Sequence, residues 1–161
     1  MQVLQHISDQ VGALKAMRRV VKPGGIIAVR EADFGSWAWY PDPARALHDD
    51  FMATYKQVAR RNGGEPDAGR MLLHWALDAG FKRDELTPSA STWCYATATE
   101  RDWWAGLWAE RIVKSGLATT AKQHAIADDA KLEAMASAWR EWGSNEDAWF
   151  AMINGEIICQ C

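Results

Sequence analysis

The sequence predicts an α/β fold in which helices pack against a sheet. A helical pattern over residues 11–21 leads directly into a short apolar stretch at 26–29. Further helical patterns separate that stretch from two later strand-like segments, at 87–96 and 149–161. Helices and strands in alternation are typical of layered α/β domains. At 161 residues, the chain is long enough for one compact domain with a hydrophobic core.

The composition argues against several classes of function. The formal net charge of -3 and the lack of a dense basic run disfavour nucleic acid as a partner. No apolar run approaches the ~20 residues of a membrane-spanning helix, and the first residues do not resemble a signal peptide. We therefore expect a cytoplasmic protein with no membrane partner. Three cysteines form no disulfide framework, and we expect Cys159 and Cys161 to be core residues.

The first helix and strand are predicted from their boundary residues. Ser8 is the expected N-cap, and Pro23-Gly24-Gly25 ends the helix because Pro cannot continue it. Ile26–Val29 contains no polar residue, which is typical of a strand buried on both faces of a parallel sheet. The charged segment 30–33 is expected to end this strand.

The remaining elements follow from periodicity and capping. We expect an aromatic loop at 35–43, a helix at 43–61, a helix opened by Asp67 and ended by Gly80, and a strand at 87–96. Thr99 with Asp102 is the expected capping box of a further helix, Thr119 or Thr120 begins a short helix, and Asp128 begins another. In the final strand, Asn154-Gly155 is either a bulge, which we favour, or a tight hairpin turn.

Ten tryptophans are an unusual number for a chain of this length and suggest an apolar cavity or a partner surface. Those that recur at helical spacing are assigned to the core: Trp104, Trp108, Trp139 and Trp142. His48, His74 and His124 are isolated from one another and from any Cys/Asp cluster, so we expect no metal site.

A known family shares the amino-terminal pattern. The turn Val3–Asp9, the helix at 11–21 and the stretch Lys22–Glu31 together resemble class I S-adenosylmethionine (SAM)-dependent methyltransferases. The chain is similar to the ubiquinone/menaquinone-biosynthesis-like branch, in which an H-L-x-D-P turn leads through a helix to L-K-P-G-G and the fifth strand. Gln10 departs from this pattern, where the family usually has Pro. Beyond residue 33 the resemblance is weaker and extends to Gly155-Glu156 in the last strand.

The resemblance implies a partial Rossmann-like methyltransferase fold, with strands five, six and seven of the family and added helices. Residues 1–161 would form a single partial domain, with 1–33 in the SAM-binding core and 34–161 as substrate-side helices and the last two strands. The family's G-x-G-x-G turn, which holds much of the cofactor, is absent. We therefore expect a truncated, carboxyl-terminal half of such an enzyme.

The resemblance also suggests site residues. Gln5 and His6 would lie past the carboxyl end of the fourth family strand and contact SAM. His6, Glu31 and Asp33 are the catalytic candidates, as a general base or as groups that orient the acceptor. For the two carboxylates, a solvated or salt-bridged surface role is the alternative, and for His6 a packed position beneath the adjoining helix.

Aromatic residues are the candidates for binding the substrate. Trp37, Trp39 and Tyr40 would form a lid over a pocket, and Tyr55 and Trp104 would line it. The expected function is therefore SAM-dependent methyl transfer to a small-molecule acceptor, at oxygen, nitrogen or carbon.

Three alternatives remain open from sequence. The chain is an inactive binding or scaffold module derived from a methyltransferase, or one part of a two-piece or domain-swapped enzyme; a Trp-rich sugar- or lipid-binding protein is a poorer third. A bare apolar edge at Gly25–Val29 predicts a homodimer, or coverage of that edge by the missing amino-terminal half.

Overall fold

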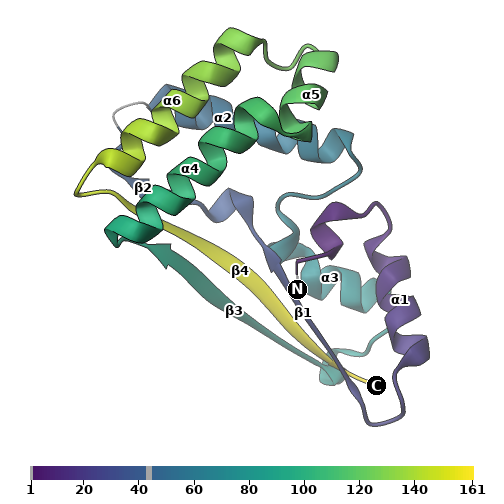
Figure 1. Cartoon of the computed structure of the whole chain (residues 1–161). Coiled ribbons are helices and arrows are strands. Elements are labelled where there is room, and N and C mark those ends of the chain that lie inside the picture. The colour runs from purple at the N-terminus through teal and green to yellow at the C-terminus, as the bar shows by residue number, and fades with distance from the viewer. Residues whose placement is uncertain (1, 43–44) are drawn as a thin grey trace. The chain divides into compact units, whose positions relative to one another are not determined.

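The computed structural model describes residues 2–42 and 45–161 and has the expected α/β composition (Figure 1). In chain order, the elements are η1 (Leu4–His6), α1 (Gln10–Val20), β1 (Ile26–Ala32), η2 (Phe34–Ser36), β2 (Ala38–Tyr40), α2 (Arg45–Arg61), α3 (Ala68–Asp78), η3 (Arg83–Glu85), β3 (Leu86–Tyr95), α4 (Ala98–Lys114), α5 (Gly116–Gln123), α6 (Asp129–Ser144) and β4 (Trp149–Gln160). The expected helix start at Pro43 lies outside the described residues.

The chain forms two compact units, and each is described by itself. The first unit comprises the residues up to Trp37, then Asn62–Trp93 and Met152–Cys161. The second comprises Ala38–Arg61 and Cys94–Ala151. The expectation of one partial domain that changes character after residue 33 stays a prediction.

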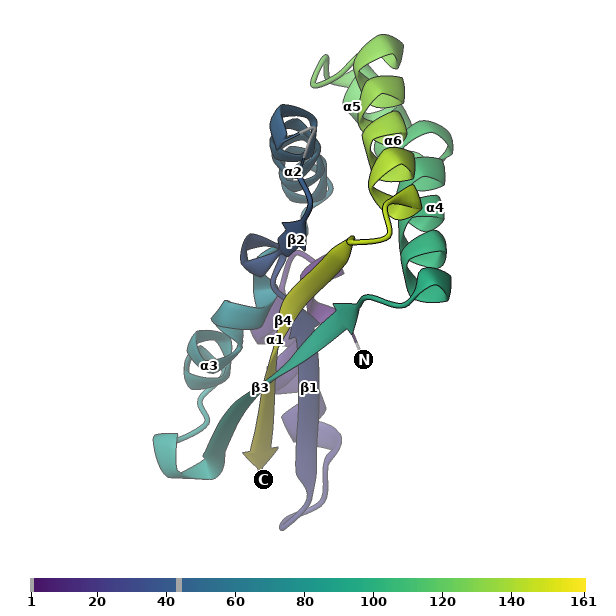
Figure 2. The same cartoon turned by 90° about the vertical axis from the view of Figure 1, so that its left-hand side faces the viewer.

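The sheet of the first unit is antiparallel where β1 meets β4. The register runs from Ile26 opposite Gln160 to Ala32 opposite Asn154, and β3 also pairs with β4 (Figure 2). The expected parallel strand buried on both faces is therefore wrong. Ile27 is buried whereas Ile26 is 60% exposed, because one face of β1 packs on the core and the other does not. The strand also continues through the charged residues as far as Ala32.

The N-cap of helix α1 lies one residue later than expected. Asp9, rather than Ser8, is the N-cap, and its Oδ1 accepts a hydrogen bond from the Gly12 backbone N–H at 2.7 Å. The predicted stop is confirmed, because α1 ends at Val20 and Gly24 has a φ of +79°. A positive φ favours glycine, which has no Cβ to clash.

Helix α3 supplies much of the first unit's core. Its start after Asp67 is confirmed, although the Asp67 side chain makes no cap hydrogen bond. The chain turns at Gly80, where φ is +92°. The helix packs against β1 and α1. The buried residues of this core include Leu4, Leu14, Ile27, Val29, Leu72, Trp75, Ala76, Ile157 and Cys159.

Strand β4 passes through Asn154 and Gly155 without turning. Neither a hairpin turn nor a bulge is present in its pairing with β1, since Ala32 and Glu31 face Asn154 and Gly155 in unbroken register. The glycine serves a close approach instead: a Cβ added at Gly155 would collide with the backbone carbonyl group of Gly69 in α3.

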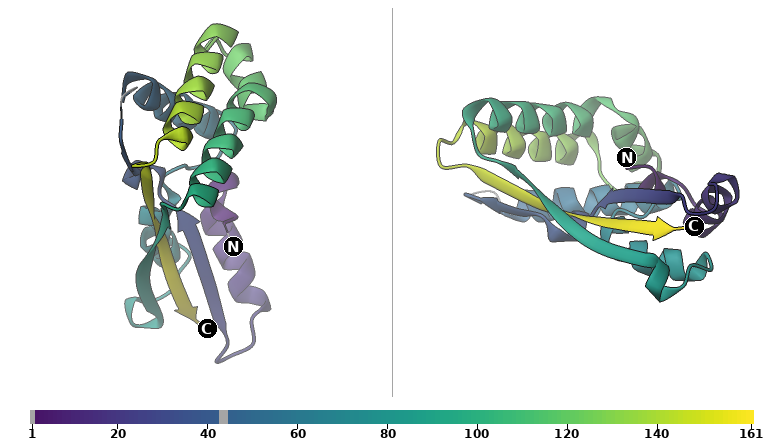
Figure 3. Two further views of the ribbon diagram at one scale, coloured as in Figure 1. Left: turned by 60° about the vertical axis from the view of Figure 1, so that its left-hand side comes forward. Right: turned by 90° about the horizontal axis from the view of Figure 1, so that it is seen from below.

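The second unit consists mainly of helices around an aromatic core. Helices α4 and α6 lie side by side (Figure 3). The four tryptophans assigned to the core, Trp104, Trp108, Trp139 and Trp142, are all buried. Strand β2 pairs antiparallel with the start of β4, from Ala38 opposite Ala151 to Tyr40 opposite Trp149.

Capping in the second unit differs from the expectation at two helices. The capping box of α4 is formed by Thr97 and Glu100, not by Thr99 and Asp102. Helix α5 begins after Ser115, whose side chain accepts a hydrogen bond from the Leu117 N–H, rather than at Thr119 or Thr120. The start of α6 after Asp128 is confirmed.

In the part of the chain that the structure describes, no helix has the length and apolar character needed to cross a membrane. The same residues contain no group of three or more His, Cys, Asp or Glu side chains arranged to hold a metal ion. The cysteines are free, with Cys159 buried and Cys94 exposed.

Candidate functional site

Polar groups of the first unit gather at the carboxyl end of β1, and Glu31 anchors them. Its carboxylate accepts hydrogen bonds from three successive backbone N–H groups, those of Val3 at 2.8 Å, Leu4 at 2.7 Å and Gln5 at 3.3 Å. The Glu31 residue is fully buried. Hydrogen bonds to an ionised acceptor are stronger than neutral ones, so Glu31 fixes η1 against the strand.

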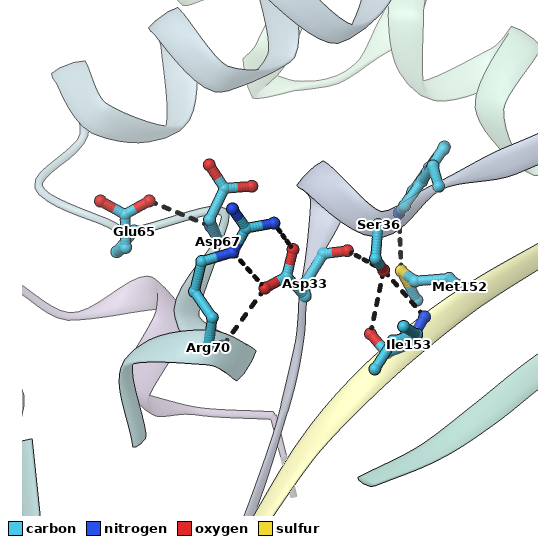
Figure 4. A network of polar contacts seen from close by, with 8 residues as sticks. Asp33, Ser36, Glu65, Asp67, Arg70, Met152 and Ile153 are labelled. Atoms are coloured by element: carbon cyan, nitrogen blue, oxygen red, sulfur yellow. Dashed lines mark hydrogen bonds and ion pairs between the residues drawn. The ribbon is translucent and has the colours of Figure 1, made fainter. Parts of the chain in front are cut away.

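A second carboxylate two residues further on connects β1 to α3. Arg70 donates from Nε to Asp33 Oδ2 and from Nη2 to Asp33 Oδ1, each at 2.6 Å (Figure 4). The Arg70 backbone N–H donates to Oδ2 as well, at 3.2 Å. The hydrogen bond to Asp33 raises the pKa of Arg70 above its usual value. This forked geometry uses both oxygens of a carboxylate that is almost fully buried.

Ser36 connects the segment after β1 to β4. Its hydroxyl donates to the Asp33 carbonyl oxygen at 2.7 Å and accepts from the Ile153 backbone N–H at 2.8 Å (Figure 4). The Trp37 indole N–H donates to the Met152 sulfur. The turn that follows β1 is therefore held to β4 by side chains of both segments.

A chain of carboxamides lies at the same end of the sheet. Gln2 Nε2 donates to Asn154 Oδ1 at 3.2 Å, and Gln5 Nε2 donates to Gln2 Oε1 at 3.5 Å. Gln5 Nε2 also lies 3.2 Å from His6 Nε2. Asn154 and Gln5 are buried, Gln2 is half-buried, and His6 is exposed. The chain therefore leads from the sheet to the surface at His6.

Two atoms of this chain have no hydrogen-bond partner among the described residues. They are Gln5 Oε1 and Asn154 Nδ2, and both are inaccessible to solvent. Buried polar atoms in proteins are normally paired, so an unpaired acceptor and an unpaired donor at one site indicate a place where a ligand can bind.

The structure therefore brings four predicted residues together, namely Gln5, His6, Glu31 and Asp33. Their catalytic and cofactor-binding roles stay predictions. The two carboxylates are engaged with backbone N–H groups and with Arg70, whereas the imidazole of His6 is exposed. Sequence reasoning missed Gln2 and Asn154, which lie 152 positions apart and carry no motif.

The predicted substrate-binding aromatic residues are divided between the units. Trp37 belongs to the first unit, and Trp39, Tyr40, Tyr55 and Trp104 belong to the second. Burial raises the pKa of the Tyr55 phenol to about 12, with a smaller opposing effect from the Arg111 cation. Their roles in substrate binding stay predictions.

A histidine that seemed isolated in the sequence has an acidic partner in the structure. His48 Nδ1 lies 2.7 Å from Asp42 Oδ1, and the imidazole is almost fully buried. Its ring centroid is 5.2 Å from that of Trp39 and 5.2 Å from that of Trp139. Asp42 lies before α2 and His48 lies within it, so no single periodicity relates the two residues and the sequence did not reveal this pair.

The chain is similar in sequence to proteins that are named as methyltransferases. The chain is 35% identical to an uncharacterized methyltransferase of Schizosaccharomyces pombe, over 98% of this chain and 55% of that protein. It is 30% identical to a probable methyltransferase of Aspergillus luteorubrus, over 91% of this chain and 52% of that protein. An uncharacterized protein from a transposon of Streptomyces fradiae is 38% identical over 62% of this chain.

No family model matches the chain. The chain spans about half the length of the two methyltransferase relatives. It is thus an α/β protein homologous to proteins named as methyltransferases, and the similarity covers both of its compact units.

Proposed function

We propose that this chain belongs to a SAM-dependent methyltransferase that transfers a methyl group to a small-molecule acceptor, in the branch that its amino-terminal pattern resembles. The observation that carries the proposal is 35% identity to a protein named as a methyltransferase over 98% of this chain. The polar cluster at the carboxyl end of β1 supports it, because the unpaired buried atoms Gln5 Oε1 and Asn154 Nδ2 indicate a place where a ligand can bind. An inactive scaffold module is not favoured, since two relatives carry the enzyme's name.

Gln5 and His6 are the residues proposed to contact the cofactor. The unpartnered Gln5 Oε1 fits an N–H or O–H donor, and SAM carries both kinds of group. The exposed imidazole of His6 is reachable from solvent. SAM would supply a methyl group on a positively charged sulfur, and the protein's part is then largely to position the acceptor.

Among the three catalytic candidates, His6 is the one proposed to take up a proton from the acceptor. Glu31 and Asp33 are proposed as positioning residues, since Glu31 holds η1 and Asp33 holds the start of α3. An acceptor of oxygen or nitrogen type that carries a proton would release it to His6 as the new bond to the methyl group forms.

Acceptor binding by the aromatic residues is a further part of the proposal. Trp37 in the first unit, and Trp39, Tyr40, Tyr55 and Trp104 in the second, supply large apolar contact areas. Each is to be tested by its own substitution.

We also propose that another chain segment covers the outer edge of β1, either a second copy or a further part of the same protein. Among the described residues, β4 is the strand that pairs with β1, which leaves the other edge open. Ile26, the first residue of β1, is 60% exposed. Open apolar edges favour pairing with further strands.

Titration of SAM into the purified chain by calorimetry, with light scattering on the same samples, tests the proposal. We expect micromolar binding, weakened about tenfold (~1.4 kcal/mol) in Gln5→Leu and His6→Ala. The control is His124→Ala, a substitution at an exposed residue of the second unit. Absence of SAM binding by the chain, with native melting behaviour, contradicts the proposal; a monomer at high concentration contradicts the homodimer.

A further inference from the structure

The carboxamide chain at the end of β1 has more hydrogen-bonding capacity than the protein itself uses. Gln2 bridges Asn154 and Gln5, yet Asn154 Nδ2 and Gln5 Oε1 find no partner among residues 2–42 and 45–161. Asn154 is 0% exposed and Gln5 is 6% exposed. An unpaired buried polar group costs about 1–3 kcal/mol, so two at one site are expensive for a purely structural arrangement.

This surplus does not depend on how the amide nitrogen and oxygen atoms are assigned. If all three carboxamides are reversed, Gln2 still uses one atom each of Asn154 and Gln5. The atoms left over are then the Asn154 oxygen and the Gln5 nitrogen. In either arrangement, one donor and one acceptor remain unpaired.

Gln2 is the replaceable member of the chain. Its side chain is half-buried, whereas the side chains on either side of it, Asn154 and Gln5, are buried. Its bonds, at 3.2 and 3.5 Å, are at the long end of the hydrogen-bond range and therefore weak. A ligand group that approaches from solvent thus has to displace only the Gln2 carboxamide.

We propose that Gln5 and Asn154 form a binding site for an uncharged group that both donates and accepts hydrogen bonds, a hydroxyl or a carboxamide of a small molecule, and that Gln2 occupies this site in the free protein. A carboxylate accepts only, so it leaves both carboxamide oxygens unpaired, and an ammonium group donates only, so it leaves both carboxamide N–H groups unpaired; neither pairs with one donor and one acceptor at once. The buried Glu31 carboxylate, which binds the Gln5 backbone N–H, further disfavours an anion.

The proposal needs no methyl transfer. The hydroxyl or carboxamide belongs either to the methyl acceptor or to the cofactor, whose ribose carries hydroxyl groups, and the experiment separates the two. Its outcome is also read independently of the proposed function.

The probes are benzamide and benzyl alcohol, with benzoate and benzylammonium as charged controls of similar shape. The side-chain amide signals of Gln2, Gln5 and Asn154 are followed by nitrogen-15 NMR. We expect both uncharged probes to shift the Asn154 and Gln5 signals and to release Gln2, whereas the charged probes do not. Equal effects of benzoate and benzamide, or no shift of these signals, overturn the proposal.

Two substitutions sharpen the test. Gln2→Ala removes the competing group and should tighten benzamide binding about fivefold, which corresponds to the loss of one hydrogen bond's net contribution of ~1 kcal/mol. Asn154→Leu should weaken it at least about tenfold. If Asn154→Leu does not fold, Gln2→Ala decides alone, and unchanged affinity in that variant overturns the proposal. Gln123→Ala, at an exposed position of α5, is the control.

A SAM titration of wild type and Asn154→Leu shows whether the bound hydroxyl or carboxamide belongs to the cofactor or to the methyl acceptor. Weaker SAM binding in the variant, together with competition between SAM and benzamide, places the bound hydroxyl on the cofactor. Unchanged SAM affinity places it on the methyl acceptor. Absence of SAM binding by wild type contradicts the proposed function, while the benzamide result still decides this proposal.

Discussion

Arg70 binds Asp33 through both its side chain and its backbone. The guanidinium donates a hydrogen bond to each carboxylate oxygen at 2.6 Å, and the backbone N–H donates to one of them. The first turn of α3 is thereby fixed to the end of β1. Asp33 is 4% exposed, but the Arg70 side chain is 57% exposed, so water remains close to the cation.

Asp33→Asn should lower the free energy of unfolding by about 2 kcal/mol, less than the loss of a partner from a fully buried pair. An amide can accept only one of the two guanidinium hydrogen bonds, and its own N–H group faces the cation. Urea unfolding measures the change, with the exposed Asp49→Asn as control. A change no larger than that of the control would show that the pair contributes nothing to stability.

Glu31→Gln should loosen η1 against β1. The amide loses the negative charge that three backbone N–H groups share, at a cost of about 2 kcal/mol. Hydrogen exchange of the Leu4 and Gln5 amides should accelerate more than exchange in α6. Glu146→Gln, at an exposed position, is the matched control. Unchanged protection of both amides would contradict this anchoring role.

Gly155→Ala should destabilise the protein by about 1–3 kcal/mol, because the added methyl group meets the Gly69 backbone and not a flexible side chain. Gly106→Ala is the control, and its expected effect on stability has the opposite sign. Nothing lies within 4 Å of the Cβ position at Gly106, which is in the middle of α4, so alanine there should stabilise by up to about 1 kcal/mol. Thermal unfolding compares the two variants. Similar melting temperatures would disprove the close approach of Gly155 in β4 to the Gly69 backbone in α3.

Tyr55 should make stability fall at alkaline pH. Its pKa is about 12 in the folded protein, against 10.0 ordinarily, so folding favours the protonated phenol. The free energy that Tyr55 contributes to folding is complete below the unfolded pKa and is lost as pH rises through the folded pKa, by about 3 kcal/mol in all. Tyr55→Phe should flatten this decline, measured by urea unfolding at several pH values between the two pKa values. Tyr40→Phe, at a 62% exposed position, should not.

Local sequence signals predicted the elements better than their partners. The helix start at Asp128 and the turn at Gly80 depend on capping and on φ, which short segments specify. The stretch at 26–29 is apolar throughout, but the burial of its two faces depends on which elements pack against them. Its antiparallel pairing with β4 was therefore hidden from local reasoning.

The candidate site shows the same division. From the resemblance, Gln5 and His6 were expected at the same edge of the sheet as Glu31 and Asp33, and the Gln5 backbone N–H does bind Glu31. The partners that define their chemistry, Asn154 and Gln2, meet only through the folded sheet. Glu31 and Asp33 were identified as notable carboxylates, but only the geometry shows that backbone N–H groups and Arg70 already bind them.

The pairing of β1 with β4 also bears on how this protein is made. Every element from η2 to α6 is synthesised after β1 and before the strand that pairs with it. Contacts between segments so distant in sequence form slowly, because the entropy of closing a long loop must be overcome first. During synthesis on the ribosome, β1 therefore lacks its partner β4 until β4 emerges. In that interval its apolar residues are available for a chaperone to bind.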